Sequence, residues 1–390
     1  MGVALPEKLR YAFTPSGGYK EGTLYSLVPN DNVGNFEVER TGVATRVNKD
    51  GLIEVVAENV PRLDYSDGGC PKLLTEVQSE NLIPYSEDFS QWTFSGDSLT
   101  SNYAISPDGT QNATRVVFSS SDELLRATTT LPMNVTCTAS IYIKGNKGDT
   151  IQISAGGVDD LKTLSGEWER IETTQTSTSA DMLIDTYGGA TARDILVWGG
   201  QLEQQPQATS YIPTNGSTVT RQTDQVTNAG DSSTFNSQSG VLLIDSKAIS
   251  DVACLSLHDG TDVNRVSILQ YVDANIFRFL IDNNGVNQLD FSTYDFEVGL
   301  DFKIAVLYST NNTSFFINGL EVATFNYGVM PSQGTFNQIS LNLGSAGFFD
   351  FYGKTKSIQH YDYLSDAEME QLTGYDSYSA MTSQFNFNVL

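Results

Sequence analysis

The chain has 390 residues, and its 47 Asp and Glu outnumber its 22 Lys and Arg, which gives a formal net charge of −25. A charge of that sign excludes nucleic acid as a partner, because binding to phosphates requires a cationic surface. Aromatic residues make up 11% of the chain, enough to fill hydrophobic cores, so disorder of the whole chain is excluded too. The length exceeds what one core usually supports, and we expect two or three domains.

Other classes of protein lack their sequence signatures here. No apolar run approaches the roughly 18 residues that a membrane-spanning helix needs, so we expect no membrane insertion. Cys70, Cys137 and Cys254 form no C-x-x-C pair, which argues against a zinc site or a disulfide framework and favours synthesis in a reducing compartment. Only His258 and His360 are present, so mechanisms that need several histidines are excluded.

Residues 1–80 show little regular periodicity. Turn clusters such as PSGG (15–18) and SDGG (66–69) separate short apolar runs, and a segment of this kind holds its shape by packing on another domain or another chain. The chain also becomes more acidic toward its C-terminus. We therefore expect residues 1–80 to be an attachment and oligomerisation segment, the end at which the protein docks.

Residues 81–215 alternate polar and apolar side chains at period two, which predicts strands. Two of these runs, 137–144 and 150–154, are separated by a turn-rich stretch and are expected to pair as a hairpin. Further strands are expected at 168–174 and 194–199. Short strands at this spacing are typical of a sandwich or jelly roll.

Residues 216–239 are polar and rich in turn formers, so we expect a linker. Residues 240–374 then form a second β pattern, with the clearest runs at 240–244, 277–281, 302–308 and 314–319. A short helix closes this domain. Its expected N-cap is Ser365, Glu368 completes a capping box, and Gly374 stops it. Residues 375–390 are expected to be an extended tail or a swapped strand.

Several ordered motifs resemble a jelly-roll module that is common in bacteriophage virion proteins and similar to carbohydrate-binding modules. They are NLIPYSEDFSQW (81–92), SPDGT (106–110), VWGGQLE (197–203) and TSYIPT (209–214). Upstream, TRVNKDGLIE (45–54) and VPRLDY (60–65) look like the segment that often precedes this module in phage tail and fibre proteins.

The C-terminal domain resembles the concanavalin A-like, laminin-G-type sandwich. The motifs that carry this resemblance are FKIAV (302–306), SFFINGLEV (314–322) and YDYLSDAEM (361–369). The family's usual Trp in the central strand is replaced here by Phe302. The two resemblances together imply an all-β fold, with two β-sandwich (jelly-roll) domains in tandem after an irregular N-terminal docking segment.

Recognition of sugars needs flat aromatic faces together with amides and carboxylates that bind hydroxyl groups. The aromatic candidates for a ligand-binding surface are therefore Trp92, Trp168, Trp198, Tyr142 and Tyr187. The alternative is that Trp168 and Trp198, which fall inside strand patterns, fill the core of the sandwich.

One acidic triplet consists of Glu167, Glu169 and Glu172. Its spacing is close to that of a triplet found in some concanavalin A-like glycosidases, in which two carboxylates about 5 Å apart cleave the glycosidic bond. Here the triplet lies in the other module, and Arg170 between the acids suits an ordinary cross-strand charge pair. We expect no catalytic residues and no enzymatic activity.

A structural calcium ion is the one cofactor that the sequence suggests. Asp259, Asp262, Asp282 and Asn284 offer oxygen ligands on two loops, although such loops are more often simple turns. His258 is expected to be a strand-end residue.

These inferences predict a non-enzymatic phage virion protein, made in the cytoplasm of the host bacterium, whose β modules bind glycans on the host surface. Its expected partners are other virion proteins, bound through the N-terminal segment, and further copies of itself in a dimer or trimer, because weak sugar sites gain avidity by repetition. One alternative is a purely structural decoration of the capsid or tail with no ligand. Another is a polysaccharide depolymerase.

Overall fold

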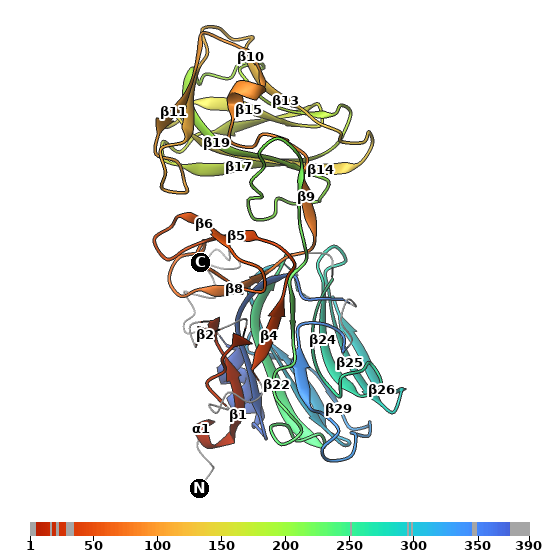
Figure 1. The fold of residues 1–390 in the computed structure, drawn as a ribbon. Helices are drawn as coiled ribbons and strands as arrows, with labels where there is room; N and C mark the ends of the chain where they lie inside the picture. The colour runs from red at the N-terminus through yellow and green to blue at the C-terminus, as the bar shows by residue number, and fades with distance from the viewer. Residues whose placement is uncertain are drawn as a thin grey trace. The chain divides into compact units, whose positions relative to one another are not determined.

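The computed structural model describes residues 5–15, 18–20, 23–28, 35–249, 252–294, 296–297, 299–344 and 349–374. The chain is nearly all β and divides into two compact units (Figure 1). Unit 1 comprises Met1–Arg40, Asn59–Val77 and Asp224–Leu390, and unit 2 comprises Thr41–Glu58 and Gln78–Thr223. The chain therefore passes between the units four times, rather than building one domain after another.

Unit 1 is a β-sandwich. In its described part, one eight-stranded sheet has the order β29-β28-β27-β22-β31-β8-β7, with β1 also paired to β31. A second sheet has the order β26-β25-β24-β23-β30, and a smaller one the order β2-β3-β4-β21. The strands are β1 (Leu9–Phe13), β2 (Tyr19–Lys20), β3 (Thr23–Leu24), β4 (Phe36–Glu39), β7 (Arg62–Asp64), β8 (Lys72–Thr75), β21 (Gln225–Thr227), β22 (Ser239–Ala248), β23 (Val252–His258), β24 (Arg265–Tyr271), β25 (Ile276–Asn283), β26 (Val286–Thr293), β27 (Phe302–Ser309), β28 (Thr313–Ile317), β29 (Leu320–Phe325), β30 (Gln338–Ser340) and β31 (Gly353–Tyr361).

The continuous apolar run at the start of β22 has a structural reason, since both faces of the strand are covered. Leu242 and Ile244 belong to the core between the sheets. Val241 and Leu243 point the other way and pack with Met369 of helix α2 (Asp366–Thr373). A strand buried on both sides loses the alternation of polar and apolar residues that a half-exposed strand shows.

Helix α2 begins and ends as the sequence predicted. The Ser365 side chain accepts from the Glu368 amide, and the Glu368 carboxylate accepts from the Ser365 amide, so the capping box is present. The helix stops before Gly374. The short helix α1 (Leu5–Lys8) brings Lys8, whose Nζ lies 2.7 Å from Glu368 Oε1. The expected C-terminal tail, 375–390, lies outside the described residues.

Unit 2, all of whose residues are described, is a second β-sandwich. Its two sheets have the orders β11-β12-β19-β14-β17 and β10-β13-β18-β15-β16, with two short pairs, β5-β6 and β20-β9. Residues such as Ile141, Ile153 and Val197 fill the core between the two large sheets. The elements are β5 (Ala44–Val47), β6 (Ile53–Val56), β9 (Ser79–Asn81), η2 (Phe89–Gln91), β10 (Thr93–Ser95), β11 (Ser98–Ala104), β12 (Ala113–Val117), β13 (Leu124–Thr128), β14 (Thr136–Lys144), β15 (Thr150–Ala155), β16 (Val158–Thr163), β17 (Glu169–Thr176), β18 (Asp181–Asp185), β19 (Asp194–Glu203) and β20 (Val219–Arg221). The predicted class, all-β with two sandwiches, is confirmed.

The hairpin predicted between 137–144 and 150–154 is wrong, although both strands exist. β14 pairs with β17 and β19, whereas β15 pairs with β16 and β18 in the opposite sheet. The turn between them carries the chain from one sheet to the other. Alternation shows that a strand has one buried face, but both sheets face the same core, so the pattern is identical in either sheet.

The N-terminal segment and the linker are built into the two sandwiches. β1 and β8 pair with β31 at the far end of the sequence, while β5 and β6 belong to unit 2. The expected linker 216–239 contains β20 and β21, and Phe235 within it is 1% exposed in the core of unit 1. Pairing between distant segments has no local signature, and for this reason these boundaries differ from the expected ones.

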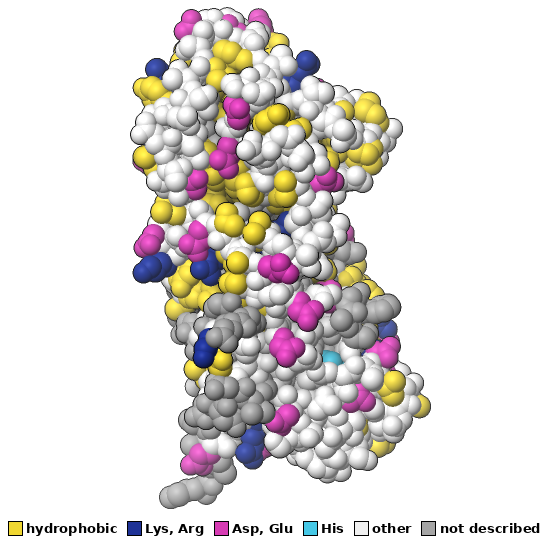
Figure 2. Space-filling view, in the orientation of Figure 1, with side chains coloured by type: hydrophobic (Ala, Val, Ile, Leu, Met, Phe, Trp, Pro, Cys, Tyr) yellow, Lys and Arg dark blue, Asp and Glu magenta, His cyan; other side chains and the backbone are white. Residues whose placement is uncertain are grey.

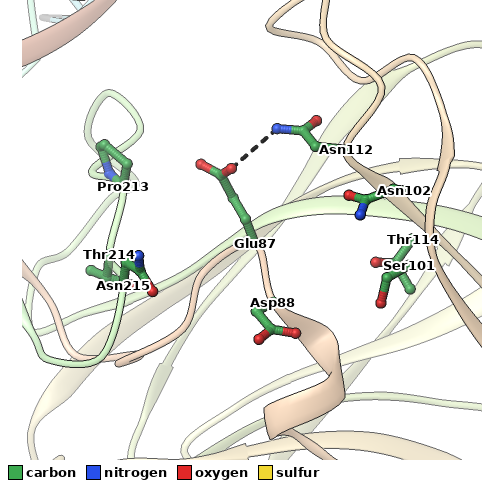
Figure 3. A pocket seen from close by; sticks show the side chains of 9 residues that line it. All are labelled: Glu87, Asp88, Ser101, Asn102, Asn112, Thr114, Pro213, Thr214 and Asn215. Atoms are coloured by element: carbon green, nitrogen blue, oxygen red, sulfur yellow. Dashed lines mark hydrogen bonds between the residues drawn. The ribbon is translucent and has the colours of Figure 1, made fainter.

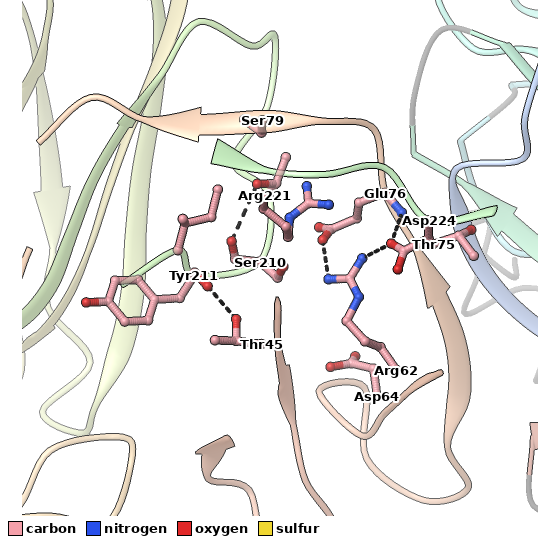
Figure 4. A network of polar contacts seen from close by, with 12 residues as sticks. Thr45, Arg62, Asp64, Thr75, Glu76, Ser79, Ser210, Tyr211, Arg221 and Asp224 are labelled. Atoms are coloured by element: carbon pink, nitrogen blue, oxygen red, sulfur yellow. Dashed lines mark hydrogen bonds and ion pairs between the residues drawn. The ribbon is translucent and has the colours of Figure 1, made fainter. Parts of the chain in front are cut away.

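A buried ion-pair network holds together three segments of unit 1 (Figure 4). Arg62 Nη1 donates to Glu76 Oε2 at 2.5 Å, and its Nη2 donates to Asp224. Arg40 Nη1 donates to the other oxygen of Asp224 at 2.8 Å. All four side chains are at most 5% exposed. Burial opposes the charge of Arg62, but Asp224 and Glu76 outweigh it and raise the pKa of Arg62.

Within the described residues, no helix is long and apolar enough to cross a membrane. Figure 2 shows acidic side chains scattered among uncharged ones over the viewed face. Cys137 and Cys254 are buried, Cys70 is exposed, and all three thiols are free.

Candidate functional site

The predicted aromatic residues of the β11-to-β17 sheet lie side by side on its outer face. Trp198 of β19 stands opposite Tyr142 of β14, which in turn stands opposite Arg170 of β17. The Tyr142 and Trp198 rings are 5.5 Å apart, and Trp198 lies 4.6 Å from the ring of Tyr211. Two of the predicted aromatic residues, Tyr142 and Trp198, thus form a row with Tyr211, which was not among the predicted site residues.

That row is covered by the chain itself. The β5–β6 hairpin places Ile53 against Trp198 and Tyr211, with Val47, Tyr142 and Trp168 packed around them. Trp198 is 1% exposed and Tyr211 3%. The cover is fixed by hydrogen bonds: Thr45 Oγ1 donates to the Tyr211 carbonyl at 2.5 Å, as Figure 4 shows, and the Ile53 amide donates to the Pro107 carbonyl at 2.9 Å. These aromatic faces are packing surfaces, not an open platform.

The other aromatic candidates lie elsewhere. Trp92 follows η2, is 6% exposed, packs on Phe89 and donates from Nε1 to the Tyr85 carbonyl at 2.8 Å. Trp168 is half-buried, and its Nε1 donates to the Ile105 carbonyl at 3.1 Å. Tyr187, also half-buried, follows β18 in the opposite sheet. The five predicted residues do not form one binding surface.

A polar pocket of about 470 Å³ opens at one edge of unit 2 (Figure 3). It lies where the segment before η2 meets strands β11 and β12 and the loop before β20. Its lining is made of carboxylates, amides, hydroxyls and one proline: Glu87, Asp88, Ser101, Asn102, Asn112, Thr114, Pro213, Thr214 and Asn215. No lysine or arginine is among these nine residues.

Local backbone irregularities shape this pocket. The register of β11 against β12 shifts between Thr100 and Ala104, and Asn102 adopts a left-handed conformation with φ of 55°. A bulge of this kind turns side chains away from the regular alternation of a strand, and asparagine tolerates the conformation better than most residues. On the opposite wall, Asp88 caps η2 by accepting from the Ser90 amide.

Glu87 is the central group of the pocket. Its Oε1 accepts from the Tyr211 hydroxyl at 2.9 Å, and its Oε2 accepts from Asn112 Nδ2 at 3.2 Å. Burial raises the pKa of Glu87, the Tyr211 hydrogen bond opposes the rise, and the nearby charge of Asp108 adds to it. Both partners of the carboxylate are uncharged, so its remaining lone pairs can accept hydrogen bonds from a ligand.

Sequence reasoning missed the residues of this pocket. Glu87 and Asp88 lie in the motif NLIPYSEDFSQW, which was considered for its resemblance alone, with no role assigned to its acids. The sequence signal that could have pointed to this site is the pair of adjacent acids, which stands between a buried run and a short helical turn. Asn102 and Asn112 carried none, because only the folded bulge brings them to Glu87.

The acidic triplet does not face one cleft. Glu167 is 84% exposed and pairs with Lys144 at 2.9 Å. Glu169 and Glu172 are three residues apart on β17, which pairs with β14 without a register shift, so their side chains leave opposite faces of the strand. A retaining pair of carboxylates would need both on one face.

The predicted calcium ligands are engaged in ordinary turns. Asp259 accepts from the Thr261 amide and from Asn264 Nδ2, and Asp282 Oδ2 accepts from Arg265 Nε at 2.7 Å. Asn284 donates its amide to Asn264 at 2.7 Å. Asp262 is exposed. In the part of the chain that the structure describes, no three His, Cys, Asp or Glu side chains gather as a metal site would require.

No protein-family model and no curated protein matches the sequence. Solved structures with some likeness include a leech intramolecular trans-sialidase complexed with 2,7-anhydro-Neu5Ac, with 17% identity over 36% of this chain and 24% of that one, at a TM-score of 0.31. This chain thus spans about a quarter of that protein.

Two further likenesses cover more of the partner structure. Domain 4 of AbnA, a GH43 extracellular arabinanase from Geobacillus stearothermophilus in complex with arabinotriose, has 13% identity over 43% of this chain and 83% of that one, at a TM-score of 0.27. Domains LG4-5 of the mouse laminin alpha1 chain have 10% identity over 64% and 89%, at a TM-score of 0.26. At these scores the likenesses say nothing about ligand or activity.

Proposed function

We propose that unit 2 binds an uncharged oligosaccharide in the Glu87 pocket. The observation that carries this proposal is the pocket itself, a hollow of about 470 Å³ lined by carboxylates, amides and hydroxyls. Its volume lies within the roughly 300–1,000 Å³ typical of ligand sites. Carboxylate and amide oxygens are the acceptors that pair with the hydroxyl groups of a sugar, and the amide nitrogens supply donors.

The charge of the lining favours a neutral glycan over an anionic one. Glu87 and Asp88 lie in the wall and Asp108 lies close by, with no basic side chain among the lining residues to balance them. A sugar carboxylate or sulfate would meet like charges in a partly desolvated site, which costs affinity.

On the scale of the whole protein, we propose a non-enzymatic adhesion protein of a bacteriophage particle, a fibre or surface-attached component made in the host bacterial cytoplasm. The support is the ordered set of motifs between residues 45 and 214 that resembles phage virion modules. Copies in a dimer or trimer, attached to other virion proteins, would convert a weak pocket into strong binding to a host surface through effective concentration.

A second candidate is a purely structural virion component without a ligand. The burial of Trp92 and Trp198 and the packing of Trp168 favour it, because the aromatic surface that a sugar would use serves the interior of unit 2 instead. The two candidates differ in whether the Glu87 pocket is used.

Isothermal titration of the full chain with neutral trisaccharides of glucose, galactose and mannose, and with trigalacturonate as the anionic counterpart, tests the proposal. We expect at least one neutral sugar to bind, and Glu87→Gln to weaken that binding about tenfold because a charged acceptor is lost. Glu167→Gln is the matched control, since that carboxylate is exposed and outside the pocket. If no sugar binds, or if Glu87→Gln binds as tightly as the original chain, the proposal fails.

A further inference from the structure

Residues 41–58 leave unit 1 and return to it at one point. The Asn59 amide donates to the Arg40 carbonyl at 3.2 Å, and the Arg40 amide donates to Asn59 Oδ1 at 2.9 Å. The intervening segment belongs to unit 2 and forms the β5–β6 hairpin, in which Ala44 pairs with Val56 and Val47 with Ile53. Residues 41–58, called the arm below, are therefore a hairpin whose two ends are joined by the hydrogen bonds between Arg40 and Asn59 in unit 1.

The arm holds Tyr211 in place. Thr45 Oγ1 binds the Tyr211 carbonyl, and Ile53 packs against the Tyr211 and Trp198 side chains. The ring fits tightly against strand β19 at Gly199, where a Cβ atom would lie 3.2 Å from Tyr211 Cε2. Gly199 also has a φ of +65°, which other residues rarely adopt, so two independent reasons require glycine there.

Tyr211 in turn holds the carboxylate of the pocket. Its hydroxyl donates to Glu87 Oε1 at 2.9 Å and lies 2.6 Å from Ser86 Oγ, which accepts from the Thr214 amide at 2.8 Å. Since a tyrosine hydroxyl has one hydrogen, donation to Glu87 requires Ser86 to donate to Tyr211. One buried hydroxyl thus links two walls of the pocket, Glu87 and Thr214.

We propose that the β5–β6 hairpin, acting through Tyr211, positions Glu87 for its ligand, so that the affinity of the pocket depends on residues 41–58. None of the nine residues that line the pocket comes from this segment. This inference rests on the proposed function of the pocket. Tyr211 is a positioning residue: its ring keeps the hairpin seated, and its hydroxyl fixes the carboxylate that meets the sugar.

Tyr211→Phe separates these two roles, because it keeps the ring and removes only the hydroxyl. We expect the neutral trisaccharide that binds the original chain best to bind this variant roughly five- to tenfold more weakly. We also expect a higher pKa of Glu87, since a hydrogen bond to the charged form is lost. Carbon-13 NMR of the carboxyl group measures this pKa, with Glu87→Gln identifying the signal. Tyr187→Phe, in the loop that follows β18 of the opposite sheet, is the matched control and should change neither value.

Removal of the arm tests the role of the hairpin. A two-residue Asn-Gly turn between Arg40 and Asn59 would reproduce the hydrogen bond that already joins these residues, which is the bond that closes a β-turn. We expect the same loss of affinity together with a red shift of tryptophan fluorescence, because Trp198 loses its cover. Should this variant not fold, Thr45→Val removes only the hydroxyl that holds the Tyr211 backbone, and we expect it to weaken binding as well.

The outcomes separate this inference from the function on which it rests. If Glu87→Gln loses binding while Tyr211→Phe and Thr45→Val bind normally with an unchanged Glu87 pKa, the positioning role is refuted and the pocket keeps its function. If no trisaccharide binds the original chain, the proposed function fails, and an unchanged Glu87 pKa in Tyr211→Phe would then refute the positioning role as well.

Discussion

The two units are both β-sandwiches, but the charges of the Arg62 network in unit 1 and of Glu87 in unit 2 are satisfied in opposite ways. In unit 1, Arg62 is enclosed by Glu76 and Asp224, and each charge meets an opposite one. In unit 2, Glu87 is held by an uncharged hydroxyl and an uncharged amide at the edge of an open pocket. The Arg62 charge is neutralised inside the fold, whereas the Glu87 carboxylate, half-buried and held by neutral donors, keeps lone pairs that a ligand in the pocket can reach.

Arg62→Ala should have the largest effect, and it should fall on unit 1. The variant leaves Glu76 and one oxygen of Asp224 buried without their cation, which typically costs about 3–5 kcal/mol in the free energy of unfolding. Hydrogen exchange of the β22 and β31 amides measures the free energy of unfolding of unit 1. Tryptophan fluorescence during urea unfolding reports unit 2 alone, because all three tryptophans belong to it.

Arg10→Ala is the control for this comparison. Arg10 also pairs with a carboxylate, Asp362, but the two side chains are 53% and 36% exposed. Exposed pairs contribute about 0–1 kcal/mol, so exchange in unit 1 should change little. Equal effects of the two substitutions would show that burial of the Arg62 network does not matter to the fold.

The buried histidines of unit 1 and the buried Asp185 of unit 2 should change the stability of their units in opposite directions on acidification. Burial lowers the pKa of His258 to about 4 and that of His360 to about 3, and both histidines belong to unit 1. Their unfolded forms take up protons below pH 6.5 while the folded forms do not. The contribution of each histidine to stability is therefore complete above pH 6.5 and is lost as the pH falls toward 4, by about 2–3 kcal/mol per histidine at pH 4.5.

Unit 2 has no histidine. Its Asp185 changes the stability of the unit with pH in the direction opposite to that of the histidines. Burial raises the pKa of this carboxyl to about 6, so the folded form takes up a proton between pH 6 and 3.8 that the unfolded form does not. This group therefore adds stability to unit 2 as the pH falls through that window. Urea unfolding followed by tryptophan fluorescence at pH 7 and pH 4.5 measures the change in the stability of unit 2, and Asp185→Asn should make this change less favourable by removing the contribution of this carboxyl. The same change in the variant as in the original chain would contradict the assignment.

The sequence predicted those features that depend on neighbouring residues. Period-two alternation located β14, β15 and β19, and the Ser365–Glu368 pair located the start of helix α2. It also placed Trp198 and Tyr142 on strands. The alternative for Trp198, a place in the core of the sandwich, differs from the structure, where the ring packs on the outer face of its sheet beneath the β5–β6 hairpin. The β5–β6 hairpin that covers these rings comes from a distant part of the chain, and no local pattern reports such packing.

The candidate site was predictable only in its chemical type. The acceptors suited to a sugar were expected, but they were sought beside the tryptophans. The pocket forms instead where the β11 bulge, the Glu87 segment and the loop at Thr214 converge, three segments whose approach depends on the finished fold.

The measurement that tests the central claim most directly is a crystal structure of the full chain with a neutral trisaccharide found to bind it. We expect the sugar in the pocket, with a hydroxyl group within hydrogen-bond distance of Glu87 and with the β5–β6 hairpin still packed on Trp198. A sugar bound against the aromatic row, with the hairpin displaced and the Glu87 pocket empty, would contradict it.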